Sequence, residues 1–411
     1  MHCGVKTILY LWIMADKSPL RQKQRKAGIR KKGAGQLPER NNNQQKNKEI
    51  MRMKLLAVMA AAALMATSTQ QAEACTGITL KTADGTSIPA RTIEWGGSDL
   101  NSKYVIVPRG YTQQSYIPGG QKNGLQFTAK YGYVGLAVEQ EEFVAEGLNE
   151  KGLSAGLFYF PRYGQYEAYS EANRQSSIAD LQLVSWILGN FSTVDEVIEG
   201  MKDVHVVAID PRASTVHWRI TEPSGRQIVI EITEGKVNVF ENKLGVLTNS
   251  PGFEWQMTNL NNYVNLYPGT AQAKTLDGTA LTSFGAGSGF LGIPGDVTPP
   301  SRFVRAAFYQ ATAPKKQTAE ETVLQCFQIL NNFDIPVGIE FADGETPADI
   351  PSATQWTSAT DMKNLAIYYR TMHNSAIRKF DLKTIKFDKV KYQAVLLDAT
   401  KHQPITTVKV K

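Results

Sequence analysis

Residues 214–242, STVHWRITEPSGRQIVIEITEGKVNVFEN, alternate strictly between apolar and polar side chains. Alternation with a period of two is typical of β-strands, and turn residues interrupt it twice, at Ser224-Gly225 and at Glu234-Gly235. The segment therefore predicts a meander of three antiparallel strands. Because the apolar face of a meander must be covered, the pattern favours a layered protein in which other elements pack on this sheet.

The rest of the chain carries patterns of strands, then helices, then strands again. Residues 75–95 predict a hairpin with its turn at Asp84-Gly85, and residues 177–204 show helical spacing that breaks once and restarts at the Thr193 cap. Further strands are expected within 104–110, 131–138 and 154–161 and after residue 366, and further helices over 300–311 and 318–333. This order predicts an α+β protein with stacked sheets and helical outer layers.

The basic residues of the chain are concentrated at its start. The net charge is +7, but 14 of the 45 Lys and Arg residues precede Cys75, against 4 of the 38 Asp and Glu residues. The remainder is close to neutral, with 31 basic and 34 acidic side chains. The positive net charge is therefore no argument for nucleic-acid binding by the rest of the chain, and no nucleic-acid partner is expected.

Composition divides the chain into three segments. Residues 1–50 are polar, basic and unable to bury a core, and are expected to be a disordered extension or an over-long gene start. Residues 51–74 have the pattern of a signal peptide. Residues 75–411 contain no linker longer than a loop and no repeat, and are expected to form a single domain.

The signal peptide is predicted from the order of its parts. Arg52 and Lys54 form a positive start, an apolar stretch follows, and Ala72-Glu73-Ala74 has the small-residue spacing of a cleavage site. The apolar stretch is too short to be a convincing membrane span. We therefore expect an exported protein, periplasmic or secreted, without stable insertion in a membrane.

Cleavage at this site would leave Cys75 as the first residue, with a thiol and a free α-amine on one residue. The α-amine has a reference pKa of about 8 and can act as general base toward the thiol. A separate histidine is then unnecessary, and His205, His217 and His373 lie near no catalytic motif. Cys326 lies in a helical apolar pattern and is expected to be a core residue. The sequence contains neither a disulfide framework nor a metal-ligand cluster, so no cofactor is expected.

Five segments, in order from Cys75 onward, resemble the choloylglycine hydrolase and penicillin V acylase family. They are CTGITL, RTIEW, EGLNEKGLSAGL, LTNSPGFEWQMTNLNNYVNL and GFLGIPGDVTPPSRFVRAA. Members of this family are N-terminal nucleophile hydrolases of linear amides. The resemblance implies that residues 75–411 form an amidase domain with a four-layer αββα sandwich. It also implies a homo-oligomer, with a homotetramer as the expected form.

The resemblance implies roles for four residues that match the family motifs. Cys75 matches the nucleophile, whose thiol attacks the amide carbon and forms a thioester. Arg91 matches an arginine that holds the thiolate electrostatically. Asn249 matches the asparagine that donates to the developing oxyanion, and Arg302 matches a second active-site arginine.

Two further positions match the family less directly. Glu94 occupies the position of an aspartate that orients the N-terminal amine, and its side chain is one methylene longer. Tyr159 occupies a position that is Asn or Tyr in the family, where the backbone N–H completes the oxyanion hole and the side chain faces the substrate. An ordinary core aromatic is the alternative there, and Phe158 lies one residue away.

The expected substrate is a small-molecule linear amide with a bulky apolar acyl part, first of all a glycine- or taurine-conjugated bile salt. Penicillin V is the alternative substrate, and a tyrosine at position 159 slightly favours it within this family. A lipid-anchored binding protein is the alternative from another class, because lipoprotein cysteines also follow a cleaved signal. Ala72 and Glu73 fit the lipoprotein pattern poorly.

The first testable prediction is that the mature protein begins at Cys75. N-terminal sequencing and intact mass of the exported protein should both give this residue, with an unmodified amine. Active protein that begins at Met1 or Met51 would contradict the prediction, and an acylated Cys75 would indicate the lipid-anchored alternative.

Overall fold

The computed structural model describes residues 73–209 and 215–410, which belong to one compact unit of the chain. The extension expected at 1–50 and most of the signal peptide expected at 51–74 lie outside the described residues. The division of the chain into these segments and a single domain at 75–411 therefore stays a prediction.

The hairpin predicted at residues 75–95 is confirmed, and it begins a five-stranded antiparallel sheet. The strand order is β1-β2-β16-β17-β18, so a strand from late in the chain pairs directly with the hairpin. The strands of this sheet are β1 (Glu73–Lys81), β2 (Ser87–Trp95), β16 (Thr354–Asp361), β17 (Ala366–Thr371) and β18 (Asn374–Asp381).

The predicted meander is also confirmed, and its three strands belong to an eight-stranded antiparallel sheet. The strand order is β13-β12-β11-β8-β7-β6-β3-β19. The strands of this sheet are β3 (Lys103–Val107), β6 (Tyr133–Ala137), β7 (Val144–Asn149), β8 (Ser154–Tyr159), β11 (Val216–Thr221), β12 (Gln227–Thr233), β13 (Lys236–Glu241) and β19 (Gln393–Leu396).

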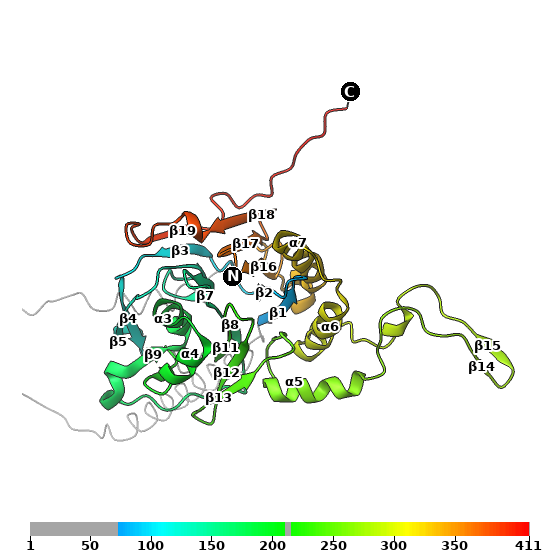
Figure 1. Cartoon of the computed structure of the whole chain (residues 1–411), viewed down its shortest axis with the longest axis horizontal. Helices are drawn as coiled ribbons and strands as arrows, with labels where there is room; N and C mark the ends of the chain where they lie inside the picture. Colours follow the sequence, from blue (N-terminus) through cyan, green and yellow to red (C-terminus); the bar gives the residue numbers. More distant parts are fainter. Residues whose placement is uncertain (1–72, 210–214, 411) are drawn as a thin grey trace, which may run out of the picture. The chain divides into compact units, whose positions relative to one another are not determined.

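Helices cover the outer faces of the two sheets (Figure 1). Helix α3 packs on β7 and β8, α6 packs on β1, and α7 packs on β2 and β16. The inner faces of the sheets meet where β1 lies against β8 and β17 against β7. Within the described residues, the α-helices are α3 (Leu183–Asn190), α4 (Val194–Gly200), α5 (Phe253–Asn259), α6 (Pro299–Thr312) and α7 (Ala319–Leu330). These four layers confirm the α+β, αββα architecture.

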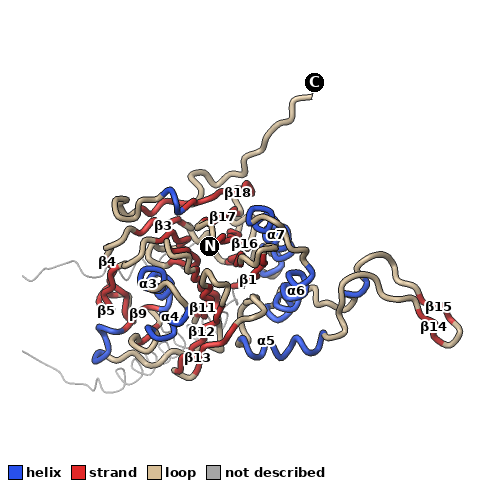
Figure 2. The backbone as a smooth tube through the Cα atoms, viewed as in Figure 1, coloured by secondary structure: helices blue, strands red, loops and turns tan. Residues whose placement is uncertain are grey.

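Shorter elements surround the layers (Figure 2). Three small sheets pair β4 (Thr112–Ile117) with β5 (Gln121–Thr128), β9 (Ser177–Ala179) with β10 (His205–Val207), and β14 (Lys274–Leu276) with β15 (Thr279–Leu281). The 3-10 helices are Glu171–Ser176, Asp180–Gln182, Leu260–Tyr263, Ser288–Phe290, Asn331–Phe333, Val337–Glu340 and Leu382–Thr384. The segment that carries β14 and β15 projects from the sheets and is exposed along both strands.

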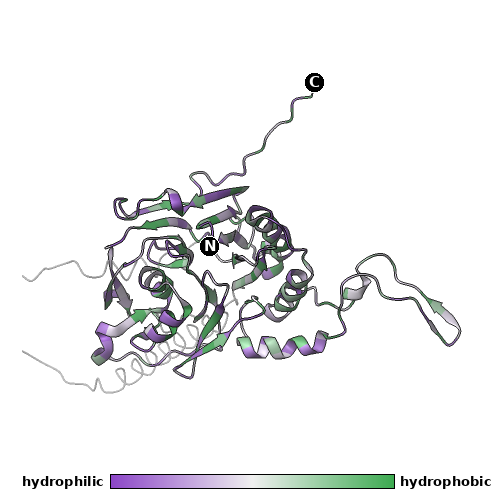
Figure 3. Cartoon of the chain, viewed as in Figure 1, coloured by the Kyte–Doolittle hydropathy of each residue, from purple (hydrophilic) through white to green (hydrophobic). Residues whose placement is uncertain are grey.

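In β11 and β12, the polar face of the meander is buried as well as its apolar face, whereas β13 is largely exposed. Hydrophobic residues, green in Figure 3, are concentrated in the strands and helices of the layered body. On β11, however, His217 and Arg219 are as inaccessible as Trp218, and Glu231 on β12 is 3% exposed. The alternation therefore separates an apolar face from a buried polar face rather than from a solvated one, because the second sheet packs over it.

The helix predicted across residues 177–204 is confirmed in its main part, with its break where the sequence placed it. Helix α3 ends at Asn190, and α4 follows with Thr193 as its N-cap, whose side chain accepts from the Glu196 N–H. The first residues of the predicted stretch instead form β9, because Ser177 pairs with His205 in a small parallel sheet.

The second prediction concerns the N-terminus of α7. The Thr318 hydroxyl accepts from the Glu321 N–H, and the Glu321 carboxylate accepts from the Thr318 N–H in return. Thr318→Ala removes this capping box and should lower the free energy of unfolding by about 1 kcal/mol, measured by urea denaturation.

Thr312→Ala is the matched control for this prediction. The Thr312 hydroxyl is exposed and donates back to the Phe308 carbonyl within α6, so its loss should change the free energy of unfolding by less than about 0.5 kcal/mol. Equal effects of the two substitutions would show that the capping box does not stabilise α7.

Candidate active site

The register between β1 and β2 brings the predicted residues of the hairpin together. Cys75 lies opposite Ile93, and Gly77 opposite Arg91, so the side chains of Cys75 and Arg91 share one face of the sheet. Ala74 lies opposite Glu94 on the other face. The Cys75 nitrogen is here a peptide nitrogen, because the residue is still joined to Ala74.

A buried guanidinium contacts the Cys75 thiol. Arg91 Nη2 lies 2.8 Å from Cys75 Sγ, and the two side chains are 0% and 3% exposed. Burial raises the pKa of the Cys75 thiol, while the positive charges of Arg91 and Arg302 lower it. The arginines therefore favour the thiolate in a place where desolvation alone would oppose it.

Arg91 is held in place by a network between the two sheets. Its guanidinium stacks 4.2 Å from the centre of the Phe158 ring, and Nη1 lies 3.9 Å from Glu146 Oε2. The same carboxylate oxygen lies 3.4 Å from Arg219 Nη2. Gly77 makes this crowding possible, since a Cβ there would lie 2.9 Å from both Arg219 and Phe158. The network orients Arg91 toward the thiol.

Asn249 lies beside the Cys75 nitrogen, and its side-chain amide has a defined orientation. Oδ1 accepts from the Cys75 N–H at 2.8 Å and from Arg302 Nη2 at 2.7 Å. Nδ2 donates to the Tyr159 carbonyl at 2.7 Å. Because an amide nitrogen carries two hydrogens, one N–H of Asn249 remains to be donated to a substrate oxygen.

Arg302 connects this amide to β1 from the first turns of α6. Its Nη1 donates to the Cys75 carbonyl and to Thr76 Oγ1 at 2.5 and 2.9 Å, and its Nε donates to the Val297 carbonyl at 2.8 Å. The side chain is fully buried. Arg302 therefore orients the main chain at Cys75 and the Asn249 amide together.

Glu94 is buried on the helix-covered face of the sheet. Thr354 Oγ1 donates to its Oε1 at 3.2 Å, and Oε2 has no hydrogen-bond partner among the described residues. Burial raises the pKa of Glu94 to about 8, opposed by the charge of Arg302 and by hydrogen bonds. A carboxylate with a free oxygen close to the Cys75 main chain is suited to receive an ammonium group there.

Tyr159 differs from its aromatic neighbours in its surroundings. Phe158 and Phe160 are 0% exposed, whereas Tyr159 is partly exposed at the end of β8. The Phe160 N–H donates to the carbonyl of Thr215, the residue just before β11. Since successive N–H groups of a strand point to opposite sides, the Tyr159 N–H points away from β11, on the side where Asn249 contacts its carbonyl.

The structure adds site residues that sequence reasoning missed. Glu340 ends a 3-10 helix after α7, and neither of its carboxylate oxygens has a hydrogen-bond partner among the described residues. Burial raises the pKa of Glu340 to about 7, and Arg302 opposes the shift. His217 and Glu231 lie behind Thr248, next to Asn249. No local sequence pattern identified Glu340, His217 or Glu231 as site residues. The one available signal was that His217 and Glu231 fall on the polar face of the meander.

Cys326 lies in α7 with a fully buried side chain, consistent with a core residue. Within residues 73–209 and 215–410, no three His, Cys, Asp or Glu side chains are grouped to hold a metal ion. In the same described part of the chain, no helix combines the length and apolarity needed to cross a membrane.

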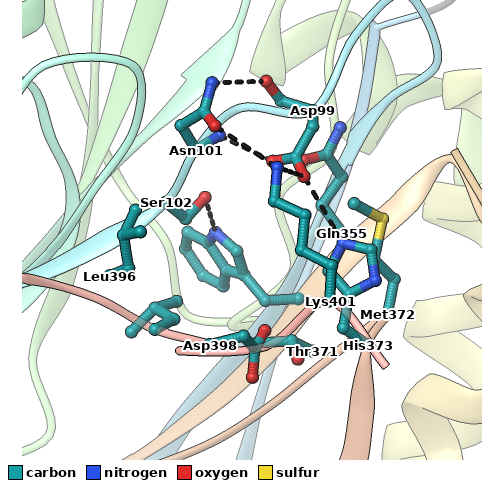
Figure 4. A pocket seen from close by; sticks show the side chains of 12 residues that line it. Asp99, Asn101, Ser102, Gln355, Thr371, Met372, His373, Leu396, Asp398 and Lys401 are labelled. Carbon is teal, nitrogen blue, oxygen red and sulfur yellow. Dashed lines mark hydrogen bonds and ion pairs between the residues drawn. The ribbon is translucent and has the colours of Figure 1, made fainter. Parts of the chain in front are cut away.

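A separate small cavity lies beneath the C-terminal segment (Figure 4). Its volume is about 30 Å³, which suits about one water molecule. Lys401 and His373 both contact Asp99, at 2.7 and 3.4 Å, and Trp356 donates to Ser102. The Lys401–Asp99 pair joins the C-terminal segment to the loop before β3, and the other two contacts join that loop to the sheet that contains β16. Cys75 does not line this cavity.

Comparison with known proteins agrees with this geometry. A family model for linear amide C-N hydrolases, choloylglycine hydrolase family, matches residues 75–394. The bile salt hydrolase/transferase of Clostridium perfringens is 33% identical over 320 residues, which cover 76% of this chain and 94% of that protein. The penicillin V acylase of Pectobacterium atrosepticum is 25% identical over 323 residues, 73% of this chain and 78% of that protein.

A solved structure has the same arrangement of layers. The crystal structure of a variant of the conjugated bile acid hydrolase from Clostridium perfringens aligns with a TM-score of 0.70 and 31% identity, covering 82% of this chain and all of that chain. The architecture is that of the N-terminal nucleophile hydrolases. By its matched segments, its fold and its relatives, the chain belongs to the choloylglycine hydrolase family of linear amide C–N hydrolases.

Proposed function

We propose that this hydrolase uses Cys75 as its nucleophile after the chain is cut between Ala74 and Cys75. The observation that carries the proposal is the 2.8 Å contact between Arg91 Nη2 and the Cys75 thiol, beside a main-chain nitrogen that faces the Asn249 amide. Cleavage converts that nitrogen into an α-amine, which is the base that a site without a nearby catalytic histidine requires.

Acylation follows from this arrangement. The α-amine takes the proton of the Cys75 thiol, and the sulfur attacks the carbonyl carbon of the amide. The charge that develops on the carbonyl oxygen is received by the free N–H of Asn249 and the backbone N–H of Tyr159, and one such donor is worth about 3–4 kcal/mol in the transition state. The α-ammonium then protonates the leaving nitrogen, the C–N bond breaks, and a thioester on Cys75 remains.

Deacylation repeats the sequence with water as the nucleophile. The α-amine takes a proton from the attacking water, and the same two donors receive the oxyanion. The C–S bond breaks, the acid leaves, and Cys75 recovers its proton. Arg91 stabilises the thiolate as it departs, since its guanidinium contacts the sulfur directly.

The uncut chain is unsuited to this reaction for two reasons. The Cys75 nitrogen is part of a peptide and has no basic lone pair. Ala74 and Cys75 are 5% and 3% exposed, because β1 continues past the nucleophile and pairs with Glu94 and Trp95. Removal of Ala74 frees both the base and the space next to the thiol.

The substrate that we propose is a conjugated bile salt. Support comes from the named activity of the Clostridium perfringens relative. The match with this chain covers 94% of that protein. Penicillin V is the second candidate, favoured by the partly exposed Tyr159 at the site and by the penicillin V acylase relative.

We also propose that the protein is exported and that it forms a homo-oligomer. Export is supported by the charge and apolar order of residues 51–74. Self-association is supported by the projecting β14–β15 segment, where Phe284 is fully exposed and Leu276 is 67% exposed.

The third prediction tests the nucleophile and the substrate together. The chain that begins at Cys75 should cleave a glycine- or taurine-conjugated bile salt faster than penicillin V, measured as kcat/KM. Cys75→Ser should lower kcat by more than about 100-fold, because a hydroxyl is harder to ionise and a weaker nucleophile than a thiol. Circular dichroism should show an unchanged fold.

Cys326→Ser is the matched control, since it makes the same chemical change in α7, away from the site. Its kcat should stay within about three-fold of the parent value, as expected for a residue that only packs. Equal losses at Cys75 and Cys326 would contradict the nucleophile assignment. Preference for penicillin V would support the acylase alternative, and no cleavage of any linear amide would reject the proposed function.

The fourth prediction concerns the stability of the chain that retains Ala74. The folded state holds the Glu94 proton up to about pH 8, whereas an exposed glutamate loses it near pH 4.5. The unfolded state therefore binds fewer protons between these values, and stability should fall as the pH rises from 5 to 8. Glu94→Gln, which stays neutral, should flatten this fall in the urea midpoint.

Two comparisons sharpen this prediction. Glu345→Gln removes an exposed carboxylate and should leave the pH dependence unchanged. In the chain that begins at Cys75, the new ammonium lowers the pKa of Glu94, so the effect of Glu94→Gln on the slope should shrink. A slope that is the same for Glu94→Gln and the parent, with Ala74 retained, would show that Glu94 does not titrate as described.

A further inference from the structure

His217 lies on the buried polar face of β11, close to the oxyanion side of the site. Its ring is 0% exposed and stacks on Phe160, with 4.4 Å between ring centres and 7° between planes. The mechanism proposed above gives this histidine no proton to transfer. Its two ring nitrogens nevertheless both contact polar groups of other elements.

The contacts of His217 converge on the segment that carries Asn249. Nε2 lies 3.1 Å from the Thr248 carbonyl, and a carbonyl oxygen only accepts, so Nε2 donates. Nδ1 lies 2.9 Å from Glu231 Oε1. The same Glu231 oxygen accepts from the Phe253 N–H at 2.9 Å, at the first residue of α5. The pair thus contacts the chain on both sides of Asn249.

We propose that His217 and Glu231 are positioning residues that place the Asn249 amide for oxyanion stabilisation. This inference rests on the proposed function and extends it to two residues that touch neither the thiol nor the substrate oxygen. Thr248 directly precedes Asn249, and its carbonyl belongs to the peptide bond that joins the two residues. A shift of this carbonyl therefore moves the main chain of Asn249, and the side-chain amide moves with it.

The geometry leaves Asn249 little freedom to compensate for such a shift. Its amide must face Cys75 and Arg302 on one side and the Tyr159 carbonyl on the other to leave one N–H for the substrate. A displacement of about 1 Å in a catalytic group lowers rates by about 100-fold. The position of the Thr248 carbonyl is therefore a requirement of the reaction as well as of the fold.

A purely stabilising role explains the pair less well. A buried His–carboxylate pair loses hydration on both partners, so replacing such a pair by apolar groups is often neutral or stabilising. Its specific effect is directional, because Nε2 and Oε1 each require a partner at one place. In this chain the two places are the Thr248 carbonyl and the Phe253 N–H.

A double-mutant cycle tests the inference in the chain that begins at Cys75. His217→Phe keeps the stacking on Phe160 and removes the hydrogen bonds. It should lower kcat for the amide substrate about 10- to 100-fold and change KM less than about three-fold, against about 100- to 1,000-fold in kcat for Asn249→Ala. The double variant should match Asn249→Ala alone, since His217 acts through Asn249.

Two controls separate positioning from general damage. Alkylation of Cys75 by iodoacetamide forms no oxyanion, so its rate in His217→Phe should stay within about three-fold of the parent rate. His205→Phe is the matched substitution, because His205 also pairs with a glutamate, Glu167, but at the surface and away from Asn249. It should leave kcat and KM unchanged.

The inference is overturned if His217→Phe has the parent kcat, if its loss adds fully to that of Asn249→Ala, or if alkylation falls in parallel with hydrolysis. Should His217→Phe not fold, Glu231→Gln, which keeps the shape and the acceptor for Phe253, is read in the same cycle by the same criteria. A parent chain that cleaves no linear amide would instead reject the proposed function itself.

Discussion

The antiparallel register of β1 and β2 is the constraint on which the rest of the site depends. It places Cys75 opposite Ile93 and Arg91 two residues further along the same face, while Glu94 lies on the opposite face. Side chains alternate along a strand, so a slip of one residue would exchange these faces. The thiol thus faces the space between the sheets with Arg91, and the Glu94 carboxyl lies on the other face of the sheet, opposite Ala74.

The space between the sheets contains buried charged side chains. Their loss of hydration costs folding free energy, and the proposed reaction gives a reason for keeping them there. Arg91, Arg219 and Glu146 are each 0–1% exposed, and buried charges are tolerated only when paired and hydrogen-bonded. They are paired here, with Phe158 stacked under both guanidinium groups. The outcome is an arginine whose direction is fixed before substrate arrives, which is the condition for strong electrostatic stabilisation of a thiolate or an oxyanion.

Local patterns predicted much of the fold but not the order of its strands. The hairpin, the meander and the helices α6 and α7 followed from periodicity and turn residues. Strand β16, which separates β2 from β17, was missed because TQWTSATD lacks an apolar alternation, although all eight of its residues are buried. Its threonines and serine are buried because neighbouring strands and α7 enclose them, and a local pattern contains no information about such neighbours.

The sequence by itself determined the candidate nucleophile, its small-residue neighbours and the family motifs that hold Arg91, Asn249 and Arg302. It also determined the strand period of the hairpin and of the meander, since period and turn chemistry are local properties. Only the tertiary structure decided that His217, Glu231, Glu146 and Arg219 face inward, because a polar face of a strand is solvated or buried according to what packs on it. The physical reason is that burial and electrostatic coupling arise between different segments of the chain, which can be far apart in sequence, as 174 residues separate Cys75 from Asn249.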